Sequence, residues 1–237
     1  MKAMILAAGE GRRMAPLTDT TPKPMLSVAG RPLIEHHLRR LREAGVTEVV
    51  INVAHLAEQL IDFLGDGSRW GIHIAISNER QPLETAGGII HALSLLGDAP
   101  FLVVNGDIYT DYPFEQLVGT LPPTAGAHLI LVANPAHNPD GDFVLINDRW
   151  PHGQIALATP EVASVDNTLT YSGMGIYCPA LFSQCVPGKQ PLKPVLDQAI
   201  ALGRITGELF KGVWEDVGTP ERLAALNRRF PRILVSQ

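Results

Sequence analysis

Apolar residues follow two alternating patterns through the first 111 positions of the chain. Four short apolar runs, typical of buried strands, lie at residues 4–8, 48–53, 72–77 and 101–105. Between them, apolar residues at helical spacing predict helices at residues 32–44, 56–64 and 87–96. Strands that alternate with helices predict a parallel sheet with helices on its faces. Right-handed crossovers then bring the carboxyl ends of these strands to one edge of the sheet.

The second half of the chain has a different pattern. Strand-like segments lie at residues 127–133, 142–147, 154–158 and 170–177, with turns at 135–141 and 150–153. Helical stretches follow near residues 191–202 and 220–229, with residues 209–217 between them. The sequence contains no internal repeat and no long linker. We therefore expect one α/β domain over residues 1–237, Rossmann-like and three-layered, with a mixed sheet flanked by helices.

Composition and charge narrow the class of protein. The net charge is -5, whereas a general nucleic-acid binder usually carries a basic surface. No apolar run approaches the roughly 20 residues of a membrane span. The short apolar run before Gly9 predicts a strand and not a signal peptide. Because Cys178 and Cys185 lack metal-binding spacing, we expect two unpaired thiols in a soluble, cytoplasmic protein.

Two glycines and an arginine follow the first predicted strand, in Gly9-x-Gly11-x-Arg13. Glycines let a backbone approach phosphate closely, and successive N–H groups can form a concave anion site. Arg13 adds a planar, permanently charged fork that suits phosphate oxygens. An ordinary glycine turn with a surface arginine is the alternative, because this glycine spacing alone is weak evidence.

A lysine stands between two prolines in Pro22-Lys23-Pro24. The prolines restrict the backbone, so they stiffen the loop and present Lys23 in a fixed direction. A point cation of this kind suits a phosphate group. The alternative interpretation is a solvated loop lysine.

Two aspartates follow apolar segments that we expect at the same edge of the sheet. Asp107 follows the apolar run at residues 101–105. Asp216 lies just before a predicted helix, for which Thr219 would be the N-cap and Pro220 the first residue. Mg²⁺ typically uses one or two carboxylates together with substrate phosphates. Glu215 competes with Asp216, but strand alternation points the two side chains in opposite directions. A turn aspartate that bonds its own backbone is the alternative for Asp107.

Small residues follow the third predicted strand in Leu83-Glu84-Thr85-Ala86-Gly87-Gly88. They would let a flat group lie against the backbone at the positive end of a helix. The alternative is a plain helix entry with Thr85 as its cap.

Taken together, these motifs resemble the sugar-1-phosphate nucleotidyltransferases. The resemblance rests on Leu6-Ala-Ala-Gly-x-Gly-x-Arg-Met-x-Pro-Leu-Thr18, Pro22-Lys23-Pro24, residues 83–88, Asn105-Gly106-Asp107 and Trp214-x-Asp216-Val-Gly-Thr-Pro220. The motifs occur in the family's order over nearly the whole chain. The resemblance implies a nucleotide-diphospho-sugar transferase fold, with a nucleotide-binding half at residues 1–111 and a sugar-phosphate-binding half at residues 112–237.

The resemblance also implies roles for individual residues. The nucleotide would contact Leu6, Ala7, Ala8, Gly9, Gly11, Arg13, Lys23, Glu79, Thr85 and Gly87. The sugar phosphate would contact Glu84, Asn105, Asp142, Tyr171 and Gly173. Arg13, Lys23 and Asp107 would be catalytic, and Asp107 with Asp216 would hold Mg²⁺. Ala15 departs from the pattern, because related uridylyltransferases often carry a basic residue there.

Within the family, the chain is most similar to the short N-acetylmuramate 1-phosphate uridylyltransferases of bacterial cell-wall recycling. Residues 83–88, Gly141-Asp142-Phe143 and Thr168-Leu-Thr-Tyr-Ser-Gly173 carry this similarity. Mannose-1-phosphate guanylyltransferases share the core, usually with glycine at position 84. The resemblance implies that the sugar phosphate attacks the α-phosphorus of UTP and that pyrophosphate leaves.

Two other classes compete with a working transferase. A regulatory subunit without catalysis would tend to lack the arginine, lysine or aspartates, all of which are present here. A dinucleotide-dependent dehydrogenase would need Gly-x-Gly-x-x-Gly running directly into a helix, whereas a proline-rich loop follows Gly11. We expect small-molecule substrates only, with no nucleic acid or membrane partner, and a monomer or small homo-oligomer.

Overall fold

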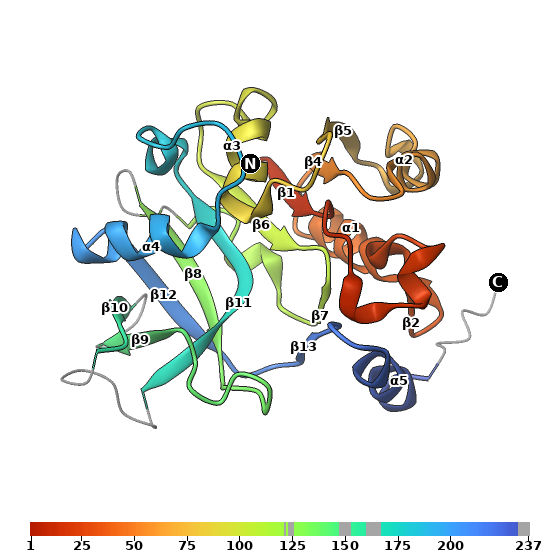
Figure 1. Ribbon diagram of the computed structural model, residues 1–237. Coiled ribbons are helices and arrows are strands. Elements are labelled where there is room, and N and C mark those ends of the chain that lie inside the picture. The colour runs from red at the N-terminus through yellow and green to blue at the C-terminus, as the bar shows by residue number, and fades with distance from the viewer. Residues whose placement is uncertain (121, 123–125, 147–152, 160–166, 232–237) are drawn as a thin grey trace.

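A mixed sheet of nine strands forms the centre of the molecule (Figure 1). The structure is a computed structural model, and it describes residues 1–120, 122, 126–146, 153–159 and 167–231. The strand order is β5-β4-β1-β6-β11-β8-β12-β10-β9. The bounds are β1 (Ala3–Leu6), β4 (Glu48–Val53), β5 (His73–Asn78), β6 (Phe101–Asn105), β8 (Ala127–Val132), β9 (Phe143–Ile146), β10 (Gly153–Leu157), β11 (Thr168–Tyr177) and β12 (Ile205–Phe210).

The direction of the strands divides the sheet. Strands β5, β4, β1 and β6 are parallel to one another, as the alternating pattern predicted. Strand β11 runs antiparallel to both β6 and β8, and it joins the second half of the chain to the parallel strands. The sheet is therefore mixed, which confirms the predicted fold class.

Helices cover both faces of the sheet. The five helices in the described residues are α1 (Leu33–Glu43), α2 (Ala57–Leu64), α3 (Glu84–Leu96), α4 (Leu192–Ala201) and α5 (Pro220–Arg229). Leu38 of α1 and Leu60 of α2 pack in one core with Ile5 of β1, whereas Ile89 of α3 packs in a second core with Met4. Successive residues of a strand face opposite sides, so adjacent Ile5 and Met4 serve the two cores.

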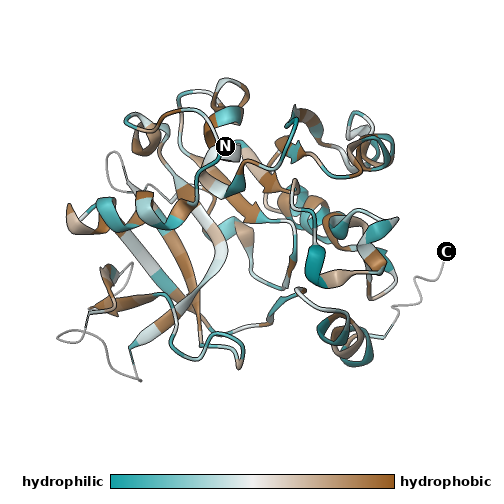
Figure 2. Ribbon diagram, in the orientation of Figure 1, coloured by the Kyte–Doolittle hydropathy of each residue, from teal (hydrophilic) through white to brown (hydrophobic). Residues whose placement is uncertain are grey.

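Hydropathy follows this layering (Figure 2). Brown segments are concentrated in the strands of the sheet, although β11 is paler, and the helices mix brown and teal residues. Among the described residues, every helix is too short or too polar to traverse a lipid bilayer. Within the part of the chain that the structure describes, neither Cys178 nor Cys185 is in a disulfide bond.

Two small two-stranded sheets lie near the edge of the main sheet that carries the site. Strand β7 (Ile108–Thr110) pairs with β13 (Trp214–Asp216), and β2 (Ser27–Val28) pairs with β3 (Arg31–Pro32). Helix α5 packs over the β2–β3 hairpin in a third apolar cluster that includes Leu26 and Leu223. Three short 3-10 turns occupy the predicted loop: η1 (Arg12–Met14), η2 (Leu17–Asp19) and η3 (Lys23–Met25).

The predicted element boundaries differ from the structure for identifiable reasons. Strand β1 ends at Leu6 and not at residue 8, because the amide of Ala7 donates to the side chain of Asn52. Helix α3 begins at Glu84, three residues before the predicted start. In the first turn of α3, backbone amides lack acceptors inside the helix, and the amide of Gly87 donates to the carbonyl of Gln190. Residues 147 and 150–152 of the predicted second half lie outside the described residues.

Candidate active site

The carboxyl ends of the parallel strands lie in register at one edge of the sheet. Leu6 of β1 pairs with Asn52 of β4 on one side and with Asn105 of β6 on the other, and Asn52 pairs with Ser77 of β5. The chain leaves the sheet at each of these points, so the loops that follow converge on one place. The predicted meeting of the motifs at this edge is confirmed.

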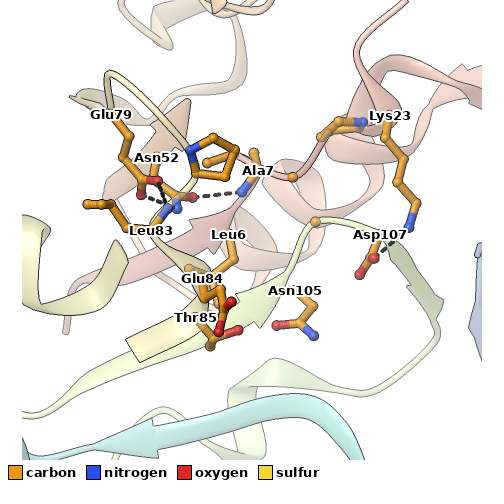
Figure 3. A pocket seen from close by; sticks show the side chains of 15 residues that line it. Leu6, Ala7, Lys23, Asn52, Glu79, Leu83, Glu84, Thr85, Asn105 and Asp107 are labelled. Carbon is orange, nitrogen blue, oxygen red and sulfur yellow. Dashed lines mark hydrogen bonds and ion pairs between the residues drawn. The ribbon is translucent and has the colours of Figure 1, made fainter. Parts of the chain in front are cut away.

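A cavity of about 170 Å³, which we call cavity A, lies at this edge (Figure 3). The predicted site residues that line it are Leu6, Ala7, Ala8, Gly9, Lys23, Glu79, Glu84, Thr85, Asn105 and Asp107. Pro24, Asn52, Pro82, Leu83 and Gly106 complete its lining. Figure 3 shows Lys23 and Asp107 at one side of the cavity and Asn52 with Glu79 at the other.

A buried hydrogen-bond network shapes one side of cavity A. Oδ1 of Asn52 accepts from the amide of Ala7 at 2.7 Å, and its Nδ2 donates to Oε1 of Glu79 at 2.8 Å. The other carboxylate oxygen of Glu79 accepts from the amide of Leu83 at 2.9 Å. Glu79 is 3% exposed, and its charge is therefore held by protein donors. The network ties the loop after β1 to the loop before α3.

The glycine loop packs tightly against the segment that carries Lys23. Gly11 has a φ of +65°, and a Cβ at this position would lie 2.9 Å from Cγ2 of Thr18 and 3.3 Å from Cβ of Lys23. The hydroxyl of Thr18 donates to the carbonyl of Gly11 at 2.9 Å. The glycine is required by conformation and by close approach together. Gly11 and Arg13 do not line cavity A, but they line a neighbouring cavity with Lys23 and Asp107.

A short ion pair joins Lys23 to Asp107 across the site. Nζ of Lys23 donates to Oδ2 of Asp107 at 2.6 Å. The lysine side chain is 9% exposed and the aspartate side chain 37%, so the pair lies at the floor of an open site. Turn η3, with prolines on both sides of the lysine, directs the ammonium group inward as the sequence predicted.

Asp107 and Asp216 are brought together by backbone pairing. Asp216 of β13 pairs with Ile108 of β7, and the amide of Val217 donates to the carbonyl of Asp107 at 2.9 Å. Both aspartates line a second cavity of about 230 Å³, cavity C, together with Arg13 and Asn105. Oδ2 of Asp216 accepts from Nη1 of Arg222 at 2.9 Å.

Glu215 points away from this cavity. Its carboxylate pairs with Arg229 at 2.9 Å, whereas the next residue, Asp216, lines cavity C with Asp107. The expectation that only one of the two acidic residues reaches the site is confirmed.

Asp107 and Asp216 are the kind of carboxylate ligands that Mg²⁺ uses. In each carboxylate Oδ2 bonds an internal cation, so that Oδ1 is the atom left for a ligand. Among the described residues there is no group of three or more His, Cys, Asp or Glu side chains that could hold a metal. Mg²⁺ needs only one or two carboxylates when phosphates and water supply the other oxygens.

The second half of the chain contributes a third cavity of about 230 Å³, cavity B. It is lined by Thr85, Asn105, Asp142, Phe143, Tyr171, Leu192, Lys193 and Leu196. Asn105 lines all three cavities, so it stands where they meet. Three of the predicted sugar-contacting residues, Asn105, Asp142 and Tyr171, therefore share one cavity.

The β-bulge in β11 fixes the position of Asn105. Pairing between β11 and β8 shifts register between Tyr171 and Met174, and Gly173 in this bulge has a φ of +81°. A Cβ on Gly173 would lie 2.5 Å from Nδ2 of Asn105. Gly173 is thus needed for close packing against Asn105, and it does not itself line cavity B or cavity C.

Comparison with known proteins agrees with this geometry. A nucleotidyl transferase family model matches residues 2–232. An N-acetylmuramate alpha-1-phosphate uridylyltransferase of Neisseria meningitidis serogroup B is 54% identical over 228 residues, which cover 94% of this chain and 95% of that protein. The chain belongs to the sugar-1-phosphate nucleotidyltransferase family.

More distant members of this nucleotidyltransferase family share the same core. A mannose-1-phosphate guanyltransferase beta-A of Xenopus laevis is 32% identical over 227 residues, covering 93% of this chain and 62% of that protein. The crystal structure of a UDP-glucose pyrophosphorylase complexed with UDP-glucose has a TM-score of 0.79 at 20% identity, covering 97% of each chain. The fold is therefore that of nucleotidyltransferases, as predicted.

Two residues predicted from the family pattern have packing partners of their own here. Gly87 does not line cavity A, and a Cβ on it would lie 2.3 Å from the carbonyl oxygen of Gly188. Close packing against Gly188 is thus one reason for a glycine at this position. Oδ2 of Asp142 accepts from the amide of Tyr171 at 2.8 Å, so this carboxylate also fixes β11.

Tyr171 is fixed at both ends. Its hydroxyl lies 2.6 Å from that of Tyr177, and burial raises the pKa of the Tyr171 phenol above its usual value. The phenol therefore remains neutral, and the Tyr171 side chain lines cavities B and C.

Sequence reasoning missed three residues of the nucleotidyltransferase site. Asn52 could have been found, because it stands near the end of an apolar strand as Asn105 does. Arg222 and His137 gave no local signal. They reach Asp216, with Nε2 of His137 at 3.3 Å from Oδ2, only because α5 and residues 135–141 meet in the fold.

Proposed function

We propose that the chain transfers the uridylyl group of UTP to N-acetylmuramate 1-phosphate, giving UDP-N-acetylmuramate and pyrophosphate, in the reuse of cell-wall sugar. The observation that carries the proposal is the 54% identity to a protein named for this activity, over 94% of this chain. UTP is a cytoplasmic substrate, so we place the enzyme in the cytoplasm. The contiguous cavities A, C and B give room for nucleotide, phosphates and sugar in that order.

In this reaction an oxygen of the sugar phosphate forms a bond to the α-phosphorus of UTP. The bond from that phosphorus to the bridging oxygen of pyrophosphate breaks, and pyrophosphate leaves as an anion. The attacking oxygen is already ionised at neutral pH, so no strong general base is required. Repulsion between the two anions is the main obstacle, and positioning with local cations overcomes it.

The cations of the site are suited to this task. Lys23 is nearly buried beside Asp107 and would stabilise charge on the α-phosphoryl group. Arg13 is exposed, lines the cavities next to Lys23 and Asp107, and would bind the triphosphate. Because the chain as a whole carries a net charge of -5, these local groups must attract the anionic substrates.

Asp107 and Asp216 would hold Mg²⁺, which when bound would neutralise phosphate charge in the reaction. The residues that would contact the nucleotide are those of cavity A, with Gly11 supporting the loop and Arg13 beside it. Glu84, Asn105, Asp142 and Tyr171 would contact the sugar phosphate. Gly173 would act by holding Asn105 in place.

The first experiment measures pyrophosphate release with four nucleoside triphosphates against several sugar 1-phosphates. We expect the highest kcat/KM for UTP with N-acetylmuramate 1-phosphate. Activity with GTP and mannose 1-phosphate, in the absence of activity with the expected pair, would overturn the substrate assignment and leave the family assignment in place. Release should stop when EDTA is added and return with excess Mg²⁺.

The second experiment tests the roles of the charged pair. Lys23→Ala and Asp107→Asn should each lower kcat by at least about 10²–10³, the usual cost of a lost charge-stabilising group. Lys211→Ala, at an exposed lysine outside the cavities, is the control. Urea unfolding of each variant separates lost catalysis from lost folding. Wild-type turnover in a folded Lys23 variant would contradict the assigned role.

A further inference from the structure

Cavity B combines an apolar wall with one cation. Phe143, Leu192 and Leu196 supply the apolar side chains, and Lys193 is the only cationic side chain among the described residues that line it. Phe143 belongs to β9 and the other three to the first turns of α4. Thr85 and Asn105 connect this cavity to cavity A.

The ammonium group of Lys193 is anchored and still able to bind. Its Nζ lies 2.8 Å from Oδ1 and 2.7 Å from Oδ2 of Asp197, one turn later on α4. It also lies 5.6 Å from the centre of the Phe143 ring. An ammonium group has three N–H donors, and Asp197 accepts two of them. The side chain is 60% exposed, so the third donor is open to a ligand.

The acidic residue of the cavity is already satisfied by protein donors. Oδ2 of Asp142 accepts from the amide of Tyr171 at 2.8 Å, and Oδ1 from Nδ2 of Asn138 at 3.3 Å. Asp142 is thus bonded to Asn138 and to Tyr171 of β11, and the carboxylate that pairs with Lys193 is that of Asp197. A ligand with a carboxylate of its own would gain from this arrangement.

We propose that Lys193 is the specificity-determining residue that binds the carboxylate of an acidic sugar in cavity B. The inference rests on the proposed function. N-acetylmuramate differs from N-acetylglucosamine by an ether-linked lactyl group, which adds one methyl and one carboxylate. The methyl suits the wall formed by Phe143, Leu192 and Leu196, and the carboxylate suits the third donor of Lys193.

The test compares two sugar phosphates that differ only in the lactyl group. kcat/KM is measured with UTP and either N-acetylmuramate 1-phosphate or N-acetylglucosamine 1-phosphate. Lys193→Met should lower the value for the acidic sugar about tenfold, the usual worth of a charge-assisted hydrogen bond, and leave that for the neutral sugar unchanged. Lys193→Arg should retain most of the preference, and Lys193→Glu should reverse it. Lys211→Met is the matched control at an exposed lysine away from cavity B.

Binding provides a readout that does not depend on turnover. Calorimetry with UDP-N-acetylmuramate and UDP-N-acetylglucosamine should show the same tenfold change for Lys193→Met, confined to the acidic product. If the wild-type enzyme uses the acidic sugar and Lys193→Met keeps the wild-type preference in both measurements, the inference is wrong and the proposed function stands. If the wild-type enzyme neither binds nor uses the acidic sugar, both are overturned.

Discussion

Replacement of Asn52 by alanine tests the link between the fold and the nucleotide cavity. Asn52 lies on β4 and is 3% exposed. Its side-chain amide bonds Ala7 at 2.7 Å and Glu79 at 2.8 Å, and Glu79 in turn holds Leu83. Ala7 and Leu83 both line cavity A, so one side chain positions two of its walls.

The expected loss of stability follows from these two hydrogen bonds. Asn52→Ala leaves the buried amide of Ala7 without its partner and removes one donor from the buried carboxylate of Glu79. A neutral hydrogen bond contributes about 1 kcal/mol and one to a charged group about 1.5–3 kcal/mol. The free energy of unfolding should therefore fall by about 3 kcal/mol. KM for UTP should rise more than kcat falls, because the change affects the walls of cavity A and not the Lys23–Asp107 pair.

Urea unfolding followed by circular dichroism measures the first effect, and initial rates at varied UTP measure the second. Asn78→Ala is the matched control, because Asn78 is an exposed residue on β5 that pairs with Val53 beside Asn52. Glu79→Gln keeps the shape but places an amide NH₂ against an N–H donor, so it should destabilise the protein in the same way. An Asn52→Ala variant that unfolds within about 1 kcal/mol of the wild type, with an unchanged KM for UTP, would refute the reasoning.

Two further changes have definite expected results. Gly173→Ala should lower kcat/KM, because its Cβ would lie 2.5 Å from Nδ2 of Asn105. Gly203→Ala is the control, because Gly203 also has a positive φ, of +65°, but a Cβ there would meet nothing within 4 Å. Equal kinetics in the two variants would contradict the prediction. Burial lowers the pKa of His37 to about 4. The unfolded chain, with a histidine pKa of about 6.5, therefore binds the proton first, and the unfolding free energy should fall by up to about 3 kcal/mol as pH drops from 6.5 to 4. His37→Leu should remove this slope in urea titrations at each pH, and His73→Leu, at an exposed histidine, should keep it.

The parallel half of the fold could be predicted because each of its elements is encoded locally. Strand β6 is an apolar run cut off by Gly106-Asp107, and α1 shows its apolar positions at helical spacing. The place of β11 could not be predicted in the same way. Its ten residues contact β6, β8 and β9, and its bulge at Gly173 depends on a close approach to Asn105 from another part of the chain.

The residues of the candidate site also differ in whether the local sequence predicts them. Lys23 was predictable because two prolines fix its direction within three residues of sequence. Arg222 was not, because its interaction with Asp216 depends on where Thr219 starts α5 and how that helix packs. Gly87 was assigned to the nucleotide from its neighbours in sequence, whereas its tight contact is with Gly188, about one hundred residues away. Contacts set by packing leave no local pattern.

The charges at the centre of the site explain how a chain with a net charge of -5 can take two anionic substrates. Each aspartate of the pair is held by a cation from a different element, Asp107 by Lys23 at 2.6 Å and Asp216 by Arg222 at 2.9 Å. These four charges sum to zero, and Arg13 adds one positive charge in the same cavity. Under the proposed mechanism Oδ1 of each carboxylate would be available to hold a divalent ion, which would add positive charge beside Arg13. Local pairing thus holds the metal-binding carboxylates in position, and the local cations compensate for an unfavourable overall charge.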